Sequence, residues 1–283
     1  MTWFTKTWLC SILRCSSLTN KELLLNLRRD TGAPFSICKE ALLFAQNDIK
    51  KARGYICDKF NHKSSKLSQK AGPLTNGLIG VGYNDHSCAL VKINCESDFV
   101  AKTQEFLVLT GKALECCLSI HDDNGKVQRF KKSVYYEHPR ILEILQEFHF
   151  EEHLKEASGK FGEKLEFGCV CIMHFTDQYI PGIYAHSSEG FINLRSPYPN
   201  HFGRIGSMAL LRQASSQQHL DLAHDIARQI TGNDPYVNAT CDEEAIQTLL
   251  QQEFLSDPTR TVSDVVIKYD AEIVSLCRDQ HSS

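Results

Sequence analysis

Hydrophobic side chains recur at helical spacing through the first sixty residues. They form three stripes with steps of three or four positions, made of Leu23, Leu24 and Leu27, then Ala41, Leu42 and Ala45, then Ile49, Ala52, Ile56 and Phe60. Gly32 suits the end of the first helix, and Asn47-Asp48 suits the start of the third. Residues 19–60 are therefore predicted to form a compact bundle of three short helices.

From Gly77 onward the apolar positions alternate, which is typical of strands. The segments 77–83 and 87–95 flank the turn residues Asn84-Asp85, and this arrangement predicts a β-hairpin. Helical spacing returns from about residue 97 to residue 118, and the stretch is predicted to be one helix.

A similar order of elements follows later in the chain. After a helix at about 151–160, alternating segments at 165–175 and 179–187 flank a turn near Thr176 and predict a second hairpin. A strand at 204–211 and another helix come next. The repeated order of hairpin and helix predicts an α+β fold whose core has two related subdomains, each a small antiparallel sheet packed on helices.

These changes of pattern divide the chain into five segments. They are residues 1–18, with the composition of a presequence; 19–62, the three-helix module; 63–76, a polar linker; 77–150, the first core subdomain; and 151–283, the second core subdomain with a C-terminal helix and strand. A chain of 283 residues is long enough for about two domains with cores of their own.

Composition narrows the function classes. Apolar residues make up 42% of the chain and charged residues 23%, which is ordinary for a soluble globular protein. The net charge of −3 gives no general attraction to nucleic acid or to an anionic membrane surface. No apolar run approaches the roughly 20 residues of a membrane-spanning helix. A soluble protein that acts on neither nucleic acid nor membrane is expected.

The first 21 residues have the composition of an organelle-targeting presequence. They contain Lys6, Arg14 and Lys21, many Ser and Thr residues and no acidic residue. Polar residues interrupt the apolar centre that a secretory signal would need. A mitochondrial presequence is favoured over an irregular N-terminus, although this segment by itself is also compatible with a plastid.

The twelve cysteines are predicted to be reduced thiols that pack as small hydrophobes. The nearest approach to a metal cluster is Cys169, Cys171 and His174, which lie in an apolar strand-like run. A zinc site needs four ligands with turn-like spacing. Core cysteines, and no bound metal or cofactor, are therefore expected.

The stretch NCESDFVAK joins the first hairpin to the following helix. Ser97 is a good helix N-cap, and Asp98 in the first turn complements the helix dipole. Phe99 precedes Phe106 by seven residues, so periodicity alone favours a place on the core-facing stripe. The alternative is an aromatic side chain projected outward. A thiol nucleophile at Cys95 is an alternative interpretation of this stretch, but no histidine is placed by sequence to activate it.

Five segments of the chain resemble translation elongation factor Ts. They are LRRDTGAPFSICKEALLFAQNDIKKA, ALVKINCESDFVAKTQEF, SGKFGEKL, LAHDIARQITGNDP and LLQQEFLSDPTRTVSDVV, in the order of that family. The likeness runs from about Lys21 to Arg278. The family's bacterial members insert a helical hairpin where this chain has only the few residues between Pro235 and Glu243, so the chain resembles the mitochondrial branch.

The resemblance implies a guanine-nucleotide exchange factor, with no covalent chemistry, in mitochondrial translation elongation. Its partner would be the GTPase elongation factor Tu in the mitochondrial matrix, bound preferentially in the nucleotide-free form. The first module would resemble a ubiquitin-associated (UBA) domain. An adaptor that binds ubiquitin through this module, with TGAPF (31–35) as the binding loop, is the alternative function.

The resemblance also implies the residues that contact the GTPase. Ser97, Asp98, Phe99 and Val100 match the segment that reaches the magnesium site, with Ser97 in place of the family's threonine. The other matching contact residues are Lys39, Phe161, Gly162 and His186. An insertion at 187–203 enlarges the loop beside His186. The resemblance favours an outward-facing Phe99 over the core interpretation.

Overall fold

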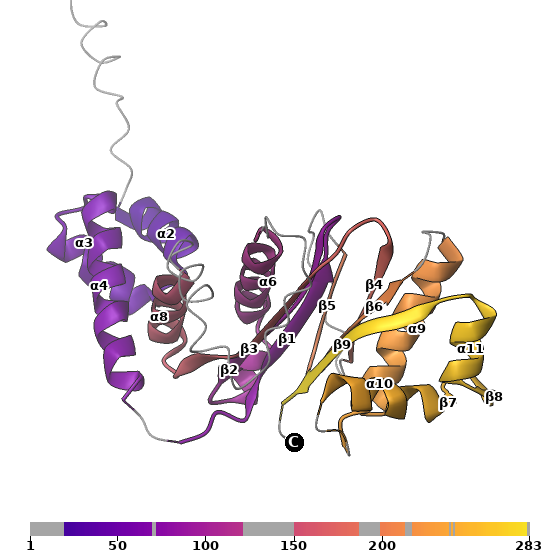
Figure 1. The fold of residues 1–283 in the computed structure, drawn as a ribbon. Coiled ribbons are helices and arrows are strands. Elements are labelled where there is room, and N and C mark those ends of the chain that lie inside the picture. Colours follow the sequence, from indigo (N-terminus) through magenta and orange to yellow (C-terminus); the bar gives the residue numbers. More distant parts are fainter. Residues whose placement is uncertain are drawn as a thin grey trace, which may run out of the picture. The chain divides into compact units, whose positions relative to one another are not determined.

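The computed structural model describes residues 20–69, 72–120, 150–186, 199–212, 217–237, 239 and 241–281. Contacts within the chain define two compact units (Figure 1). Unit 1 contains Met1–Gln69 and Lys155–Gly162, and unit 2 contains Lys70–Leu154 and Glu163–Ser283. The predicted presequence at 1–18 lies outside the described residues.

Unit 1 contains the three predicted N-terminal helices: α2 (Asn20–Thr31), α3 (Phe35–Phe44) and α4 (Ile49–Leu67). Asp48 caps α4, because its carboxylate accepts hydrogen bonds from the backbone N–H groups of Lys50 and Lys51 at 2.9 and 3.1 Å. The apolar stripes of the three helices meet in one core. Helix α4 continues into the segment predicted as a linker at 63–76, because Leu67 is still buried.

The end of helix α8 (Phe150–Phe161) completes unit 1. Gly159 lies directly against α4, and a Cβ atom at this position would lie 2.3 Å from the carbonyl oxygen of Phe60. Only glycine allows the two backbones to approach this closely.

Sheet A of unit 2 has the strand order β3-β2-β1-β5, and neighbouring strands are antiparallel. The strands are β1 (Asn76–Tyr83), β2 (Ser87–Cys95), β3 (Leu165–His174) and β5 (Asn200–Gly203). The predicted hairpin at 77–95 is confirmed as β1 and β2. Strand β5, which lies within the 187–203 insertion, was not predicted.

Sheet B has the order β4-β6-β9, with strands β4 (Tyr179–His186), β6 (Ile205–Arg212) and β9 (Glu272–Gln280), again antiparallel. The predicted second hairpin is wrong. Strand β3 pairs with β2 from Ser87↔His174 to Cys95↔Leu165, whereas β4 pairs with β6. Local alternation identifies a strand, but it does not identify the strand that supplies its hydrogen bonds.

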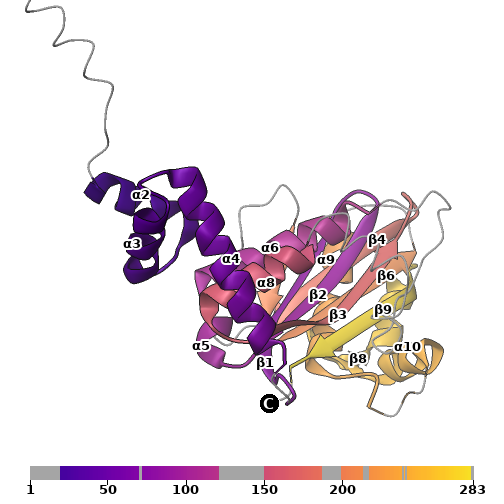
Figure 2. The same ribbon diagram turned by 90° about the vertical axis from the view of Figure 1, so that its left-hand side faces the viewer.

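The two sheets of unit 2 lie between helices (Figures 1 and 2). Helix α6 (Gln104–Leu118) packs on β1 and β2, and helix α9 (Gln217–Gly232) packs on β4 and β6. The unit therefore has the predicted mixed α+β character, with antiparallel sheets packed on helices. Within the described ranges, no helix has the length and apolar character needed to cross a membrane.

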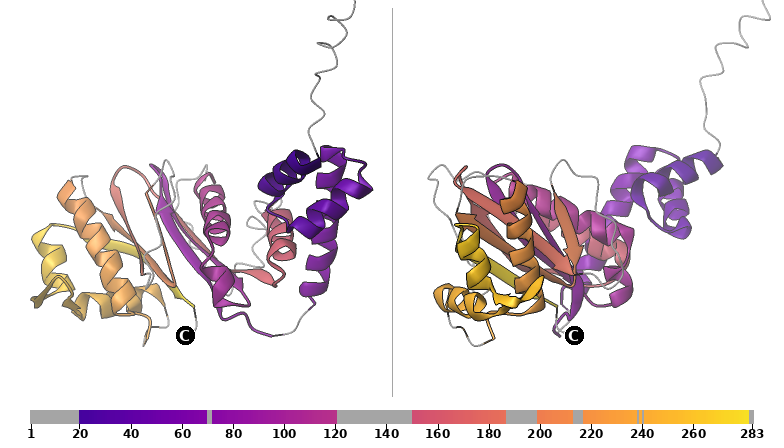
Figure 3. Two further views of the ribbon diagram at one scale, coloured as in Figure 1. Left: turned by 180° about the vertical axis from the view of Figure 1, so that it is seen from behind. Right: turned by 90° about the vertical axis from the view of Figure 1, so that its right-hand side faces the viewer.

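The C-terminal part of unit 2 adds small elements beside sheet B (Figure 3). They are α10 (Asp242–Gln251), the short hairpin of β7 (Glu253–Phe254) and β8 (Asp257–Thr261), and α11 (Val262–Lys268). Thr261 and Asp264 form a capping box that starts α11. Tyr236, between α9 and α10, donates a hydrogen bond to the carbonyl of Leu276 in β9 at 3.1 Å.

Ten cysteines lie in the part of the chain that the structure describes, and none of them forms a disulfide. Cys169, Cys171 and His174 of β3 are 4–8% exposed, so the prediction that they belong to the core is confirmed.

Candidate functional site

The candidate site is the junction where β2 gives way to helices. A short helix, α5 (Asp98–Ala101), follows the strand and contacts β1 and β2 (Figure 2). We call residues Ser97, Asp98, Phe99 and Val100 the α5 tip. Ser97 has extended backbone angles and is the N-cap, because its Oγ accepts a hydrogen bond from the Val100 N–H at 3.3 Å.

Helices α5 and α6 are separate, so the prediction of one continuous helix is wrong. Thr103 lies between them with φ −76° and ψ 147°, and it caps α6 through a hydrogen bond from the Phe106 N–H at 3.2 Å. This break resets the helical phase. Phe106 is fully buried, whereas Phe99 is 80% exposed. The core interpretation of Phe99 is therefore wrong, because it assumed an unbroken helix.

The backbone of the α5 tip is held while the Phe99 side chain faces outward. Val100 and Ala101 are each 8% exposed. The Thr103 Oγ1 donates a hydrogen bond to the Val100 carbonyl at 2.8 Å. Val100 was grouped with the partner contacts, but its side chain packs within unit 2, where it anchors the tip.

Asp98 occupies the first turn of α5, where its charge complements the helix dipole. Its carboxylate forms an ion pair with Lys102 at 3.2 Å, and both side chains are nearly half exposed. A pair of this kind contributes about 0.3–0.5 kcal/mol. A partner could therefore replace Lys102 at little cost, so Asp98 is available for recognition.

Two carboxylates fix the residues that precede α5. Glu163 accepts two hydrogen bonds from Ser97, one from Oγ at 2.6 Å and one from the backbone N–H at 3.0 Å. Glu96 accepts a hydrogen bond from the Lys164 N–H at 2.9 Å, and its own carbonyl accepts one from the Asn76 side chain at 3.0 Å. Neither carboxylate could be predicted as part of the site, because no local pattern connects residues 66 and 68 positions apart.

Cys95 is fully buried at the end of β2, and its Sγ donates a hydrogen bond to the Ser97 carbonyl at 3.1 Å. Burial, reinforced by the negative charge of Glu163, raises the pKa of the Cys95 thiol to about 12. The thiol is therefore protonated at neutral pH and inaccessible. These properties exclude the nucleophile reading of Cys95.

His186, the other predicted contact residue in unit 2, is exposed at the end of β4. Its carbonyl accepts a hydrogen bond from the Arg204 N–H at 2.9 Å, which ties the end of β4 to the start of β6. Most of the insertion that follows His186 lies outside the described residues. The role of His186 in binding stays a prediction.

Unit 1 carries the remaining predicted contact residues. Lys39 is exposed on α3, next to the buried Cys38. Phe161 and Gly162 are partly exposed at the end of α8. Gly162 has φ +79°, a left-handed conformation that ends the helix, and its N–H donates to the Ser158 carbonyl at 2.8 Å.

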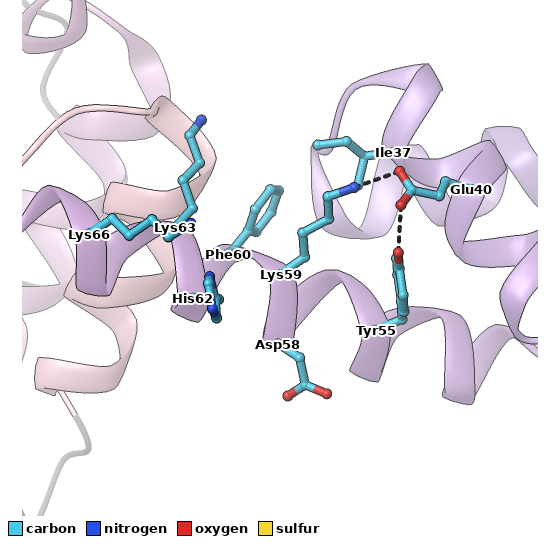
Figure 4. A pocket seen from close by; sticks show the side chains of 9 residues that line it. All are labelled: Ile37, Glu40, Tyr55, Asp58, Lys59, Phe60, His62, Lys63 and Lys66. Carbon is cyan, nitrogen blue, oxygen red and sulfur yellow. Dashed lines mark hydrogen bonds and ion pairs between the residues drawn. The ribbon is translucent and has the colours of Figure 1, made fainter.

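Unit 1 also contains an open cavity of about 560 Å³ along α4 (Figure 4). Its lining residues are Ile37, Glu40, Tyr55, Asp58, Lys59, Phe60, His62, Lys63 and Lys66. Glu40 accepts hydrogen bonds from Lys59 Nζ and from Tyr55 Oη, both at 2.5 Å, and these bonds lower the pKa of its carboxyl. Lys39 does not line this cavity.

Comparison with known proteins gives consistent matches. A family described as "Elongation factor TS" matches residues 96–247, just over half of the chain. "Elongation factor Ts, mitochondrial" of Aedes aegypti is 27% identical over 279 residues, covering 94% of this chain and 89% of the relative. The proteins of the same name from Bos taurus and Homo sapiens are 28% and 26% identical over 275 residues, which cover 93% of this chain and 80% and 83% of theirs. The family match includes both the α5 tip and Glu163.

Proposed function

The chain belongs to the elongation factor Ts family, whose members are nucleotide exchange factors for elongation factor Tu and not enzymes, and we propose how it acts on its partner. It releases GDP from mitochondrial elongation factor Tu by inserting the α5 tip near the magnesium and phosphate site of the GTPase. The observation that carries the proposal is Phe99, an aromatic side chain 80% exposed on a backbone fixed by hydrogen bonds and by buried neighbours.

Insertion of Phe99 supplies the driving force. Transfer of its ring from water into a pocket of the GTPase contributes about 2 kcal/mol. The held backbone limits the entropy lost on binding, so most of this free energy is available. The binding of GDP to the GTPase depends on a Mg²⁺ ion that bridges the phosphates of GDP to protein ligands. An open conformation of the GTPase that accommodates the ring no longer lets those ligands converge.

Thermodynamic linkage determines which form of the GTPase the chain binds more tightly. A factor that weakens GDP binding is itself bound less tightly when GDP is present, by the same ratio. The chain therefore prefers nucleotide-free elongation factor Tu, and incoming GTP displaces it. Asp98 orients the inserted segment through a polar group of the partner, for which it exchanges the weak ion pair with Lys102. No cofactor and no covalent step are required.

The other contact residues give the complex its affinity. Lys39, Phe161 and Gly162 of unit 1 and His186 of unit 2 form secondary contacts with the GTPase. Helices α2, α3 and α4 form a UBA-like module, and residues 77–150 and 151–283 form two related α+β subdomains of the core. Strands β3 and β5 of the second segment pair with the β1–β2 hairpin of the first. The ubiquitin adaptor is the weaker alternative, because the family match covers most of the core.

The site of action is the mitochondrial matrix. The basic, Ser- and Thr-rich N-terminal segment and the mitochondrial relatives support this assignment. Fusion of residues 1–21 to a fluorescent protein tests it: import into mitochondria is expected, and a diffuse cytosolic or plastid signal contradicts it.

Release of a fluorescent GDP analogue from mitochondrial elongation factor Tu tests the main proposal. A catalytic amount of the chain should accelerate release in the presence of excess unlabelled nucleotide. A release rate that does not depend on the concentration of the chain contradicts the proposal. Titration with ubiquitin in parallel decides the adaptor alternative.

A further inference from the structure

We propose that Glu163 is a positioning residue for the α5 tip. Glu163 and Lys164 exchange hydrogen bonds with Glu96 and Ser97, and we call these four residues the carboxylate clamp. The clamp sets the direction in which Phe99 is presented. The functional part of this inference rests on the proposed function of the tip.

The carboxylate of Glu163 uses both of its oxygens on one residue. Oε1 accepts from the Ser97 hydroxyl at 2.6 Å, and Oε2 accepts from the Ser97 N–H at 3.0 Å. Hydrogen bonds to an ionised acceptor are shorter and stronger than neutral ones, and a two-point contact also fixes orientation. Glu163 therefore restrains both the main chain and the side chain of Ser97.

The Ser97 hydroxyl relays this restraint into α5. A hydroxyl has one proton to donate and lone pairs that accept. Because the proton is directed to Glu163, a lone pair is left for the Val100 N–H at 3.3 Å. Loss of the carboxylate would let the hydroxyl rotate and would weaken the N-cap.

The clamp holds Glu96 as well as Ser97. The Lys164 N–H donates to Glu96 Oε1 at 2.9 Å, and the Asn76 side chain donates to the Glu96 carbonyl at 3.0 Å. The two residues before α5 are thus fixed by bonds from β1 and from the segment that leads into β3.

Helix α5 needs such support because it has only four residues. A single helical turn gains too few backbone hydrogen bonds to be stable alone. Burial of Val100 and Ala101 attaches the turn to unit 2, and the clamp sets where the turn begins. Removal of Glu163 should therefore loosen α5 locally and leave the sheets and the other helices intact.

Glu163→Ala is the test variant, and Glu166→Ala is its control. Glu166 is a neighbouring carboxylate on β3, paired with Lys164 at 2.5 Å, and it makes no contact with Ser97 among the described interactions. Amide hydrogen exchange of the full chain, without partner, should be about tenfold faster for residues 97–102 in Glu163→Ala than in wild type. Exchange elsewhere should be unchanged, and Glu166→Ala should match wild type.

Two further variants keep the test decisive if Glu163→Ala folds poorly. Ser97→Ala removes the relay without a change of charge and should accelerate exchange over the same residues. Glu163→Gln keeps one acceptor and should give an intermediate rate. If amides 97–102 exchange at the wild-type rate in all three variants, the clamp is overturned. This outcome does not depend on whether the chain accelerates GDP release from the GTPase.

Kinetics then separate positioning from general stability. Glu163→Ala should lower the maximal rate of GDP release and leave the half-saturating concentration unchanged. In a Phe99→Ala background, the same substitution should cause a smaller loss, because the ring that Glu163 positions is absent. Equal losses in both backgrounds would overturn the positioning role. If the wild-type chain does not accelerate GDP release from elongation factor Tu, the proposed function is refuted. The hydrogen-exchange result would still test the clamp independently.

Discussion

Substitution of Phe99 by alanine removes the ring on which the proposed mechanism depends. The side chain is 80% exposed in the free protein, so the substitution leaves no cavity. Surface substitutions of this kind usually change the free energy of unfolding by less than about 0.5 kcal/mol. The N-cap bond and the Glu163 contacts involve the backbone and Ser97, and they remain.

The expected loss follows from the exposed fraction. Full burial of a phenylalanine side chain is worth about 1.5–3 kcal/mol, and the 80% exposure of Phe99 leaves about 2 kcal/mol to be gained in the complex. Each 1.4 kcal/mol corresponds to a factor of ten in rate, so the maximal rate of GDP release should fall about 30-fold.

Stopped-flow release of a fluorescent GDP analogue from mitochondrial elongation factor Tu measures this rate. The concentration of the variant is raised to saturation, so that weaker association is separated from slower release. Ile267→Ala is the matched control, because Ile267 is an apolar side chain 73% exposed on α11. This variant should promote GDP release from elongation factor Tu at the wild-type rate.

Phe106→Ala distinguishes insertion from stability. Phe106 is fully buried, and its truncation should cost about 3–5 kcal/mol of unfolding free energy. Its activity should follow the folded fraction alone. Two results would refute the insertion of the ring. One is that Phe99→Ala unfolds as readily as Phe106→Ala, and the other is that Phe99→Ala promotes GDP release from the GTPase at the wild-type rate.

Three other outcomes are expected. Lys39→Ala should raise the half-saturating concentration for GDP release by up to about fivefold, with the maximal rate unchanged, because an exposed charge contributes about 1 kcal/mol at most. Since the pKa of the Cys95 thiol is about 12, its alkylation in the folded protein should stay negligible between pH 7 and 9; rapid labelling would contradict its burial. Burial and the charge of Lys92 lower the pKa of His281 to about 3. The part of the unfolding free energy that depends on neutral His281 is therefore present above about pH 6.5, and it is lost as the pH falls toward 3. Urea titrations should show a fall of about 1 kcal/mol per pH unit in that range, and His281→Gln should flatten it.

The helices of unit 1 could be predicted because their signals are local. Asp48 caps α4, and Gly32 adopts φ +64° after α2, as residue type and position suggested. The first hairpin is equally local, since Asn84 accepts hydrogen bonds from the N–H groups of His86 and Ser87 in the turn. In each case neighbouring residues supply the hydrogen bonds that define the element.

Long-range pairing could not be predicted in this way. Strand β3 pairs with β2 across a long intervening segment, and β5 joins β1, so the partner of each strand depends on the folded core. The same holds for Glu163, which lies beside Ser97 because β2 and β3 are paired in the folded core.

The orientation of Phe99 illustrates both sources of information. Periodicity placed it with Phe106, but the cap at Thr103 interrupts the helix and turns the ring away from the core. The family resemblance indicated the exposed orientation. No rule of spacing showed that Thr103 would start a second helix instead of continuing the first.

In the proposed mechanism, the α5 tip makes the nucleotide-free GTPase the preferred partner. Calorimetric titration of mitochondrial elongation factor Tu, once free of nucleotide and once saturated with GDP, measures this preference for the wild-type chain and for Phe99→Ala. We expect the wild-type chain to bind the nucleotide-free form more tightly, and we expect this preference to be about 30-fold smaller in the variant. The same ratio of affinities in both proteins would contradict it.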